Sequence, residues 1–259
     1  MNIVINTWSG RLGNNITHLM NCILVALYYN FNVSIPPHRY FKKTYITINN
    51  NISKEDKTFA PNGNLFYLEK FITEYKLDRS LTTKNIEFTR NILQEIFTIN
   101  NVPTLHENTV VIHIRGGDIF SLWPHNAYIM PPLSYYKNII TSNNFKKFIM
   151  ISEDKNNPCV NKLLELYPSI EFKIQTLEED IKLLLGSQNV IESFGSFSPA
   201  LLTLSKNIKN IYRPSYSHDT LLSKLPHKYN IFETNLDDYK QKMSPWKNTA
   251  EQRNIMMTY

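Results

Sequence analysis

Residues 109–118 read Thr-Val-Val-Ile-His-Ile-Arg-Gly-Gly-Asp. The first six are almost continuously apolar and β-branched, which is typical of a strand that is buried on both faces of a parallel sheet. The two glycines that follow predict a turn at the carboxyl end of this strand. The stretch therefore predicts an α/β domain built around a parallel sheet.

Strands and helices alternate on the carboxyl side of this stretch. Strands are predicted at 148–151, 170–174, 189–192 and 208–212, and helices after Pro132, at about 158–167, at about 177–186 and after Ser198. Repeated β-α units favour a Rossmann-like domain, which we expect to span residues 106–235. Residues 236–259 are predicted to form a tail helix that packs back on the N-terminal domain.

The amino-terminal side predicts a β-turn-α-β opening. A β-branched run at 2–6 is followed by a glycine-containing turn at 9–13, an apolar-periodic segment at 14–29 and a second short run at 33–35. The pattern is weaker between 40 and 108, where we expect helices near 65–75 and 86–97. Residues 1–105 are thus predicted to form a first Rossmann-like domain.

Composition narrows the class of protein. With 259 residues, 42% of them hydrophobic, the chain can bury a substantial core. The net charge of +6 suits an anionic partner, but Lys and Arg are scattered, which argues against nucleic-acid binding.

The apolar run at 22–27 is too short to span a membrane, and no signal peptide is evident, so we expect a cytoplasmic protein. Cys22 and Cys159 lie far apart and predict no disulfide framework.

Ligands of open parallel sheets bind at the carboxyl ends of the strands, so the turns there are the candidate sites. In Ser9–Asn15 the glycines let backbone approach a ligand, and the following helix offers free N–H groups to a phosphate. The alternative is a tight turn with Arg11 in water.

The turn His113–Asp118 is the stronger candidate. Arg115 follows the most apolar strand, and a guanidinium can hold a diphosphate through two hydrogen bonds. The alternative is an Arg115–Asp118 ion pair that braces the turn. His113 lies on the same side of the strand as Arg115, either as part of the site or as a structural residue.

The third turn, Glu192–Pro199, offers serine hydroxyls and backbone N–H groups as a neutral phosphate cradle, or an ordinary N-cap before Pro199.

The sequence lacks the motifs that several other classes of enzyme would need. There is no Asp-x-Asp, no phosphate loop of the Walker type, no zinc spacing and no G-x-S-x-G. The carboxylates at 178–180 come closest to a metal pair, but Thr176 and Glu179 form a capping box that explains Glu179 without metal.

Together these residues resemble the fucosyltransferase superfamily, which includes the α1,2-, α1,6- and protein O-fucosyltransferases. Gly10–Asn14 is similar to the family's G-R-L/F-G-N-Q, His113–Asp118 to its H-x-R-R-x-D, and Asp180–Ser198 to its D-x-x-x-L…V…T/S-F-S. The resemblance implies an α/β fold of the GT-B type, in which two Rossmann-like domains face each other across a cleft. The first domain would lie on the acceptor side and the second would bind the nucleotide sugar.

The resemblance also implies roles for individual residues. Arg115 would bind the donor diphosphate and stabilise the leaving nucleotide, while His113 and Asp180 would contact the base. Asp118 is the nearest candidate for the proton acceptor. The remaining donor-binding residues would be Gly10, Arg11, Gly13, Asn14, Ser196, Phe197 and Ser198.

Two positions depart from the family pattern. Gly116 replaces the family's second arginine and Asn15 replaces its glutamine, so the donor is GDP-fucose-like or another nucleotide sugar such as UDP-xylose. The aromatic stretch that follows looks more like a subgroup of its own than like the well-known members of the family. Its side chains Trp123, His125 and Tyr128 would stack on the acceptor sugar or pack in a domain interface.

The resulting hypothesis is an inverting, metal-independent glycosyltransferase that needs no cofactor beyond its nucleotide-sugar co-substrate and transfers to a glycan hydroxyl. One rival is a non-catalytic nucleotide-sugar or glycan-binding protein of the same fold, and another is a basic RNA-binding protein. The sequence leaves the oligomeric state open. Its Asn-, Lys- and Ile-rich usage is typical of an AT-rich microbial or large viral genome.

Overall fold

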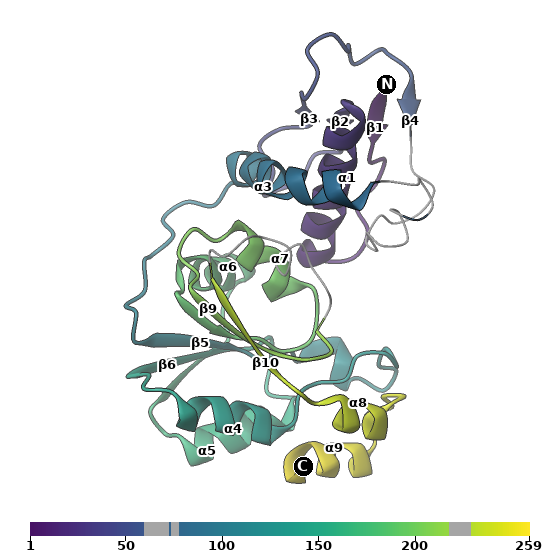
Figure 1. Ribbon diagram of the computed structural model, residues 1–259. Helices are drawn as coiled ribbons and strands as arrows, with labels where there is room; N and C mark the ends of the chain where they lie inside the picture. The colour runs from purple at the N-terminus through teal and green to yellow at the C-terminus, as the bar shows by residue number, and fades with distance from the viewer. Residues whose placement is uncertain (60–72, 74–77, 218–228) are drawn as a thin grey trace. The chain divides into compact units, whose positions relative to one another are not determined.

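The computed structural model describes residues 1–59, 73, 78–217 and 229–259 (Figure 1). The chain divides into two compact units, one within residues 1–100 and the other within residues 101–259. Both are α/β, and the second is built on a parallel sheet. The helix predicted near 65–75 lies almost entirely outside the described residues.

The first unit opens with the predicted β-turn-α-β arrangement, which is confirmed. Strand β1 (Asn2–Val4) pairs in parallel with β2 (Asn32–Ser34), and α1 (Leu12–Tyr29) connects them. Helix α1 is almost entirely buried up to Ala26 because its apolar side chains occupy more than one face. It ends at Asn30, whose φ of 57° is the left-handed conformation that closes many helices.

The rest of the first unit completes a small mixed sheet in the order β3-β2-β1-β4. Strand β3 (Tyr45–Ile46) is antiparallel to β2, and β4 (Thr58–Phe59) is parallel to β1. Helix α3 (Arg79–Ile96) packs against α1 and begins earlier than the predicted 86–97.

The second unit contains a six-stranded, fully parallel sheet in the order β10-β9-β8-β5-β6-β7. Its strands are β5 (Thr109–His113), β6 (Lys147–Ile151), β7 (Ile170–Lys173), β8 (Asn189–Ile191), β9 (Asn210–Pro214) and β10 (Asn230–Thr234). The order starts at β5, runs outward to β7, and then reverses to β8 on the other side of β5. This is the Rossmann strand order, with its switch point between β5 and β8.

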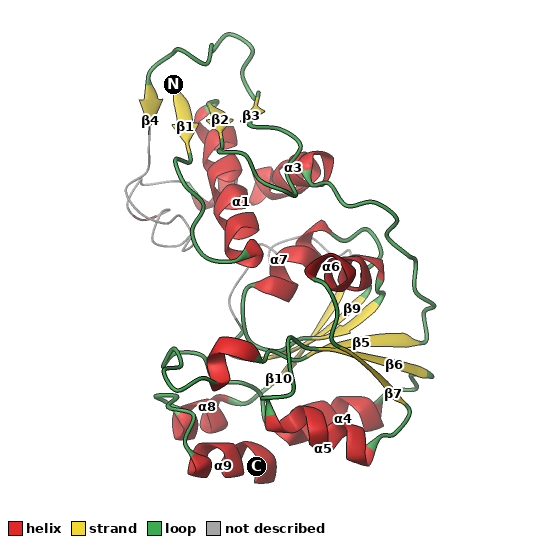
Figure 2. Ribbon diagram, turned by 180° about the vertical axis from the view of Figure 1, so that it is seen from behind, coloured by secondary structure: helices red, strands yellow, loops and turns green. Residues whose placement is uncertain are grey.

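Helices cover both faces of this sheet (Figure 2). Helices α4 (Leu133–Ser142) and α5 (Pro158–Leu166) pack together on one face, and α6 (Leu177–Gly186) and α7 (Phe197–Leu204) pack together on the other. The capping box predicted for α6 is confirmed, since Glu179 accepts from the backbone N–H of Thr176 and the Thr176 hydroxyl accepts from that of Glu179. The strand β10 was not predicted, because it is an edge strand that is largely exposed and lacks a clear apolar alternation.

The C-terminal region corrects the expectation that it packs back on the N-terminal domain. It forms α8 (Asp237–Met243) and α9 (Ala250–Thr258), and α9 packs against α4 and α5 of the second unit. Met243, Trp246 and Met256 are buried in the same core as the apolar side chains of α4 and α5. Full burial of a methionine side chain contributes roughly 1.5–3 kcal/mol, which explains why the tail stays on this core.

Two further observations concern the cysteines and the length of the described helices. Cys22 and Cys159 are free thiols, and both are buried. Across the described ranges, no helix has the length and apolar character needed to cross a membrane.

Candidate functional site

The switch point between β5 and β8 places His113 and Glu192 side by side. The register pairs Ile112 with Ile191, and the next residue on each strand lies at the carboxyl edge of the sheet. Crevices at such switch points are where open α/β sheets bind ligands. Arg115 comes two residues after His113, so its side chain is expected on the same side of the sheet as the side chain of His113.

Buried polar atoms without a hydrogen-bond partner gather at this edge. Within the part of the second unit that the structure describes, most of these atoms follow or end a strand: His113 Nδ1, Ser152 Oγ, Glu192 Oε1, Tyr216 OH and Ser217 Oγ. Buried polar groups in folded proteins are nearly always satisfied, and a polar ligand is one partner that satisfies them. His113 and Glu192 lie at the switch point and the other three residues follow the neighbouring strands β6 and β9, which favours this edge as the binding site.

Arg115 is held by two side chains of the segment that follows it. Its Nη2 donates to both carboxylate oxygens of Asp118, at 3.3 and 3.4 Å, and its guanidinium lies 4.7 Å from the centroid of the Tyr128 ring. The turn-bracing ion pair considered above is thus present. It leaves the other N–H donors of the guanidinium for a ligand, because Asp118 engages only one of its three nitrogens.

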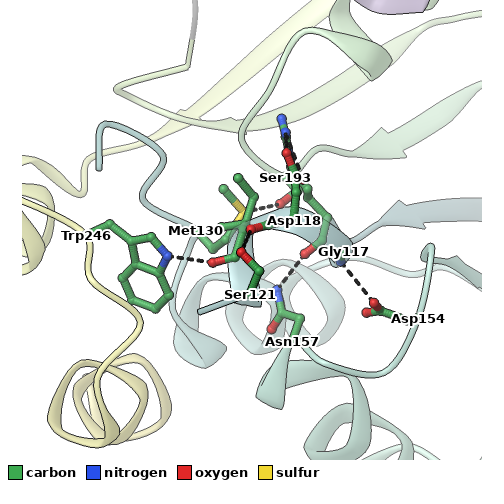
Figure 3. Close-up of polar contacts among 10 residues, drawn as sticks. Gly117, Asp118, Ser121, Met130, Asp154, Asn157, Ser193 and Trp246 are labelled. Atoms are coloured by element: carbon green, nitrogen blue, oxygen red, sulfur yellow. Dashed lines mark hydrogen bonds and ion pairs between the residues drawn. The ribbon is translucent and has the colours of Figure 1, made fainter. Parts of the chain in front are cut away.

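The backbone beside Arg115 requires glycine. Gly195 has a φ of 138°, and a Cβ there would lie 2.7 Å from Arg115 Nη1. At Gly116 a Cβ would overlap the carboxylate of Asp154, which accepts from the Gly117 N–H at 3.1 Å (Figure 3). A side chain at Gly116 would therefore require the carboxylate of Asp154 to move.

Glu192 is a candidate that the sequence reasoning did not include among the site residues. Its side chain is only 2% exposed, and burial raises its pKa to about 7, although a hydrogen bond with Ser198 and the charge of Arg213 act in the opposite direction. The signal was available, since a glutamate directly follows a buried apolar strand. A carboxyl group that titrates near neutrality at a switch point is typical of functional sites.

His113 is neutral at physiological pH. Burial, assisted by the positive charge of Arg115, lowers its pKa to about 4. Its ring lies 5.5 Å from that of Phe197, the first residue of α7. A neutral imidazole carries one donor and one acceptor, so His113 can hydrogen-bond to a polar ligand without adding charge.

Of the two interpretations of the third turn, the ordinary N-cap before Pro199 is not what the structure contains. Helix α7 begins at Phe197, so Pro199 is its third residue, and the N-cap position belongs to Ser196, which makes no side-chain capping bond. Ser198 is buried beside Glu192. Phe197 and Ser198 therefore join the group around His113 and Glu192.

Asp180 belongs to α6 and lies near residues that follow β6 and β7, away from the β5–β8 switch point. It accepts a hydrogen bond from Gln175 at 3.0 Å, and burial raises its pKa to about 6, with the charges of Glu179 and Glu153 adding to the rise. Glu153 follows β6 and Gln175 follows β7, so Asp180 is associated with those strands. Its predicted contact with the base stays a prediction.

No group of three His, Cys, Asp or Glu side chains that could hold a metal ion occurs among the residues with described positions.

The predicted turn Gly10–Asn14 belongs to the first unit and connects β1 to α1. Arg11 is exposed at the N-cap position of α1, and the carbonyl of Gly13 accepts from the Thr17 hydroxyl at 2.9 Å. The turn thus opens a helix as expected. Its contacts with a donor stay predictions.

The three acceptor candidates occupy different environments. The side chain of Trp123 is 92% exposed, whereas His125 and Tyr128 stack on each other with ring centroids 4.5 Å apart. Tyr128 also contacts Phe194 at 5.6 Å. Tyr128 therefore packs against the guanidinium of Arg115, whereas the ring of Trp123 is accessible to a ligand.

The fold and site define a Rossmann-type parallel α/β domain with an arginine and two titratable side chains at its switch point. Neither a family model nor a curated protein matches the chain. Among solved structures, the chain is similar to the NodZ α-1,6-fucosyltransferase, from a crystal soaked with GDP-fucose. This match has 12% sequence identity and a TM-score of 0.40, and it covers 79% of this chain and 92% of that one. A likeness of this degree assigns no activity to the chain.

Proposed function

We propose that this protein is a glycosyltransferase that takes its sugar from a nucleotide sugar, with Arg115 as the residue that binds the diphosphate. The carrying observation is the position of Arg115 at the β5–β8 switch point, where its guanidinium is fixed by Asp118 and Tyr128 and where buried polar atoms of His113 and Glu192 have no hydrogen-bond partner. The sequence motifs around Arg115 and Ser196–Ser198 support a GDP-fucose-like donor, with UDP-xylose or another nucleotide sugar as the alternative.

The proposed reaction is a single inverting displacement that uses no metal. An acceptor oxygen attacks the anomeric carbon, the bond from that carbon to the phosphate oxygen breaks, and the nucleoside diphosphate leaves with the electron pair. Arg115 stabilises the negative charge that develops on the leaving group, which is the role a metal ion has in other enzymes. The acceptor proton goes to a carboxylate, for which Asp118 is the candidate.

The donor screen tests this function directly. Purified protein is measured by thermal shift and by hydrolysis against GDP-fucose, other GDP-sugars, UDP-xylose and other UDP-sugars, with EDTA present. We expect one donor to raise the melting temperature and to be hydrolysed slowly. If none of these nucleotide sugars gives a thermal shift or is hydrolysed, the proposal is contradicted.

The rival functions give different results in the same screen. A donor that binds but is neither hydrolysed nor transferred indicates the non-catalytic binding protein. An RNA affinity that falls steeply with salt and survives the Arg115→Ala substitution indicates the RNA-binding protein.

We also propose that Trp123 stacks on the acceptor sugar. Replacing it by alanine should raise the acceptor KM roughly tenfold, which corresponds to about 1.4 kcal/mol of lost binding. Donor affinity and melting temperature should stay unchanged, because Trp123 is 92% exposed. Leu122→Ala is the matched control, since the neighbouring side chain is 89% exposed. An unchanged acceptor KM in Trp123→Ala would show that the acceptor binds elsewhere.

A further inference from the structure

The segment that follows Arg115, residues 118–130, is held along its length by the C-terminal region. Four of its backbone carbonyls accept hydrogen bonds from residues 239–248, which we name the C-terminal clamp. The bonds run from Trp246 Nε1 to Ile119 O (2.8 Å), from Asn248 Nδ2 to Ser121 O (3.0 Å), from Trp246 N to Asn126 O (2.9 Å) and from Tyr239 OH to Met130 O (3.0 Å). Figure 3 shows Trp246 directed at this segment next to Asp118 and Ser121.

The clamped segment carries both side chains that hold the guanidinium of Arg115. Asp118, its hydrogen-bonded partner, directly precedes the clamped carbonyl of Ile119. Tyr128, whose ring lies 4.7 Å from the guanidinium, stands between the clamped carbonyls of Asn126 and Met130. The position of Arg115 therefore depends on a segment whose own partners come from the far end of the chain.

The clamp is built to be rigid. Tyr239 and Trp246 are at most 1% exposed, and the Trp246 ring makes an edge contact with Phe120 at 5.7 Å. Asn248 is itself fixed by Arg253, whose Nε donates to its side-chain oxygen at 2.7 Å. Buried hydrogen bonds of this kind are costly to break, because each leaves a donor or an acceptor unsatisfied.

We propose that the C-terminal clamp positions Arg115 for the donor diphosphate, with Tyr239, Trp246 and Asn248 as positioning residues. This inference rests on the proposed function of Arg115. A binding group must be held to within about 0.5 Å by the residues behind it, and displacement of about 1 Å can cost two orders of magnitude in rate. Loosening the clamp thus weakens donor binding without touching a residue that contacts the donor.

The main experiment uses Tyr239→Phe, which removes the hydrogen bond to Met130 O and keeps the buried ring. Its matched control is Tyr259→Phe, the same change at an exposed tyrosine whose ring lies 4.9 Å from that of Tyr239, a contact that the substitution keeps. Asn248→Ala is the second clamp variant, at a more exposed position. With GDP-fucose and UDP-xylose as probes, we expect the Kd of whichever binds to rise 5- to 10-fold in both clamp variants and to stay unchanged in the control.

A double substitution separates positioning from general stability. In a Tyr128→Leu background, Tyr239→Phe should add no further loss of affinity, because the connection to Arg115 is already cut. Losses of affinity that add fully in the double variant would overturn the inference. So would wild-type affinity in both clamp variants, and in that case the proposed function of Arg115 stands.

A measurement without any donor keeps the two proposals distinguishable. Relaxation of the Arg115 Nε–H group in the NMR spectrum should show greater side-chain mobility in Tyr239→Phe than in wild type or Tyr259→Phe. Unchanged mobility overturns the positioning inference even if neither nucleotide sugar binds. Increased mobility supports it in the same circumstance, while the failure to bind counts against the donor assignment.

Discussion

Replacing Arg115 by alanine should lower kcat by roughly 10²- to 10³-fold, the usual loss when a group that stabilises developing charge is removed. The guanidinium is half-buried at the switch point, and its positive charge acts on His113. Donor affinity should fall in the same variant, because the diphosphate loses its charged hydrogen-bond donors. Steady-state kinetics and calorimetry with the donor found in the screen measure the two effects.

Two companion variants test whether Arg115 only braces its turn. Asp118→Asn removes the ion pair but leaves the guanidinium, and Arg115→Lys keeps the charge but loses the planar fork. If Arg115 binds the donor, Asp118→Asn should lower donor affinity through looser positioning, but less than Arg115→Lys does. Equal donor affinity in Arg115→Ala and wild type would rule out the diphosphate role.

Glu192→Gln should stabilise the protein above neutral pH by up to roughly 3 kcal/mol, since burial raises the pKa of Glu192 from 4.5 to about 7. Between these two pH values the folded state binds more protons than the unfolded state, so the contribution of Glu192 to stability falls as pH rises. Below pH 4.5 the carboxyl group is protonated in both states, and the effect should vanish. Urea denaturation at several values of pH measures the difference.

The control for this variant is Glu165→Gln, which removes an exposed carboxylate that pairs with Lys162 on the surface. Exposed ion pairs contribute little to stability, so this variant should keep the pH dependence of wild type. A pH dependence in Glu192→Gln that matches wild type between pH 5 and 8 would show that Glu192 is not held neutral by burial.

Some of the site could be predicted from local sequence alone. The apolar run that ends at His113 identifies a buried strand, and the glycines after Arg115 identify its turn, because both properties depend on neighbouring residues. The pairing of Arg115 with Asp118 was likewise foreseeable, since the two residues are only three positions apart. The capping box of α6 is local in the same sense.

The partners of these residues could not be predicted in this way. Tyr128 beneath Arg115 and the carbonyls held by the C-terminal clamp depend on where distant segments pack. The helix-forming pattern of the tail indicates that it needs a core but not which one, so its predicted position on the N-terminal domain was wrong. Trp246 and Met256 are buried together with side chains of α4 and α5, so the core that the tail joins is that of the second unit.

The sequence by itself determined that the second unit is a series of β-α units with Arg115 at the end of its most apolar strand. Only the tertiary structure decided that β8 lies beside β5, which sets Glu192 next to His113. The physical reason is that side-chain periodicity reports whether a strand is buried, whereas strand order depends on the side to which each crossover helix returns. The local pattern of apolar residues is the same for either side.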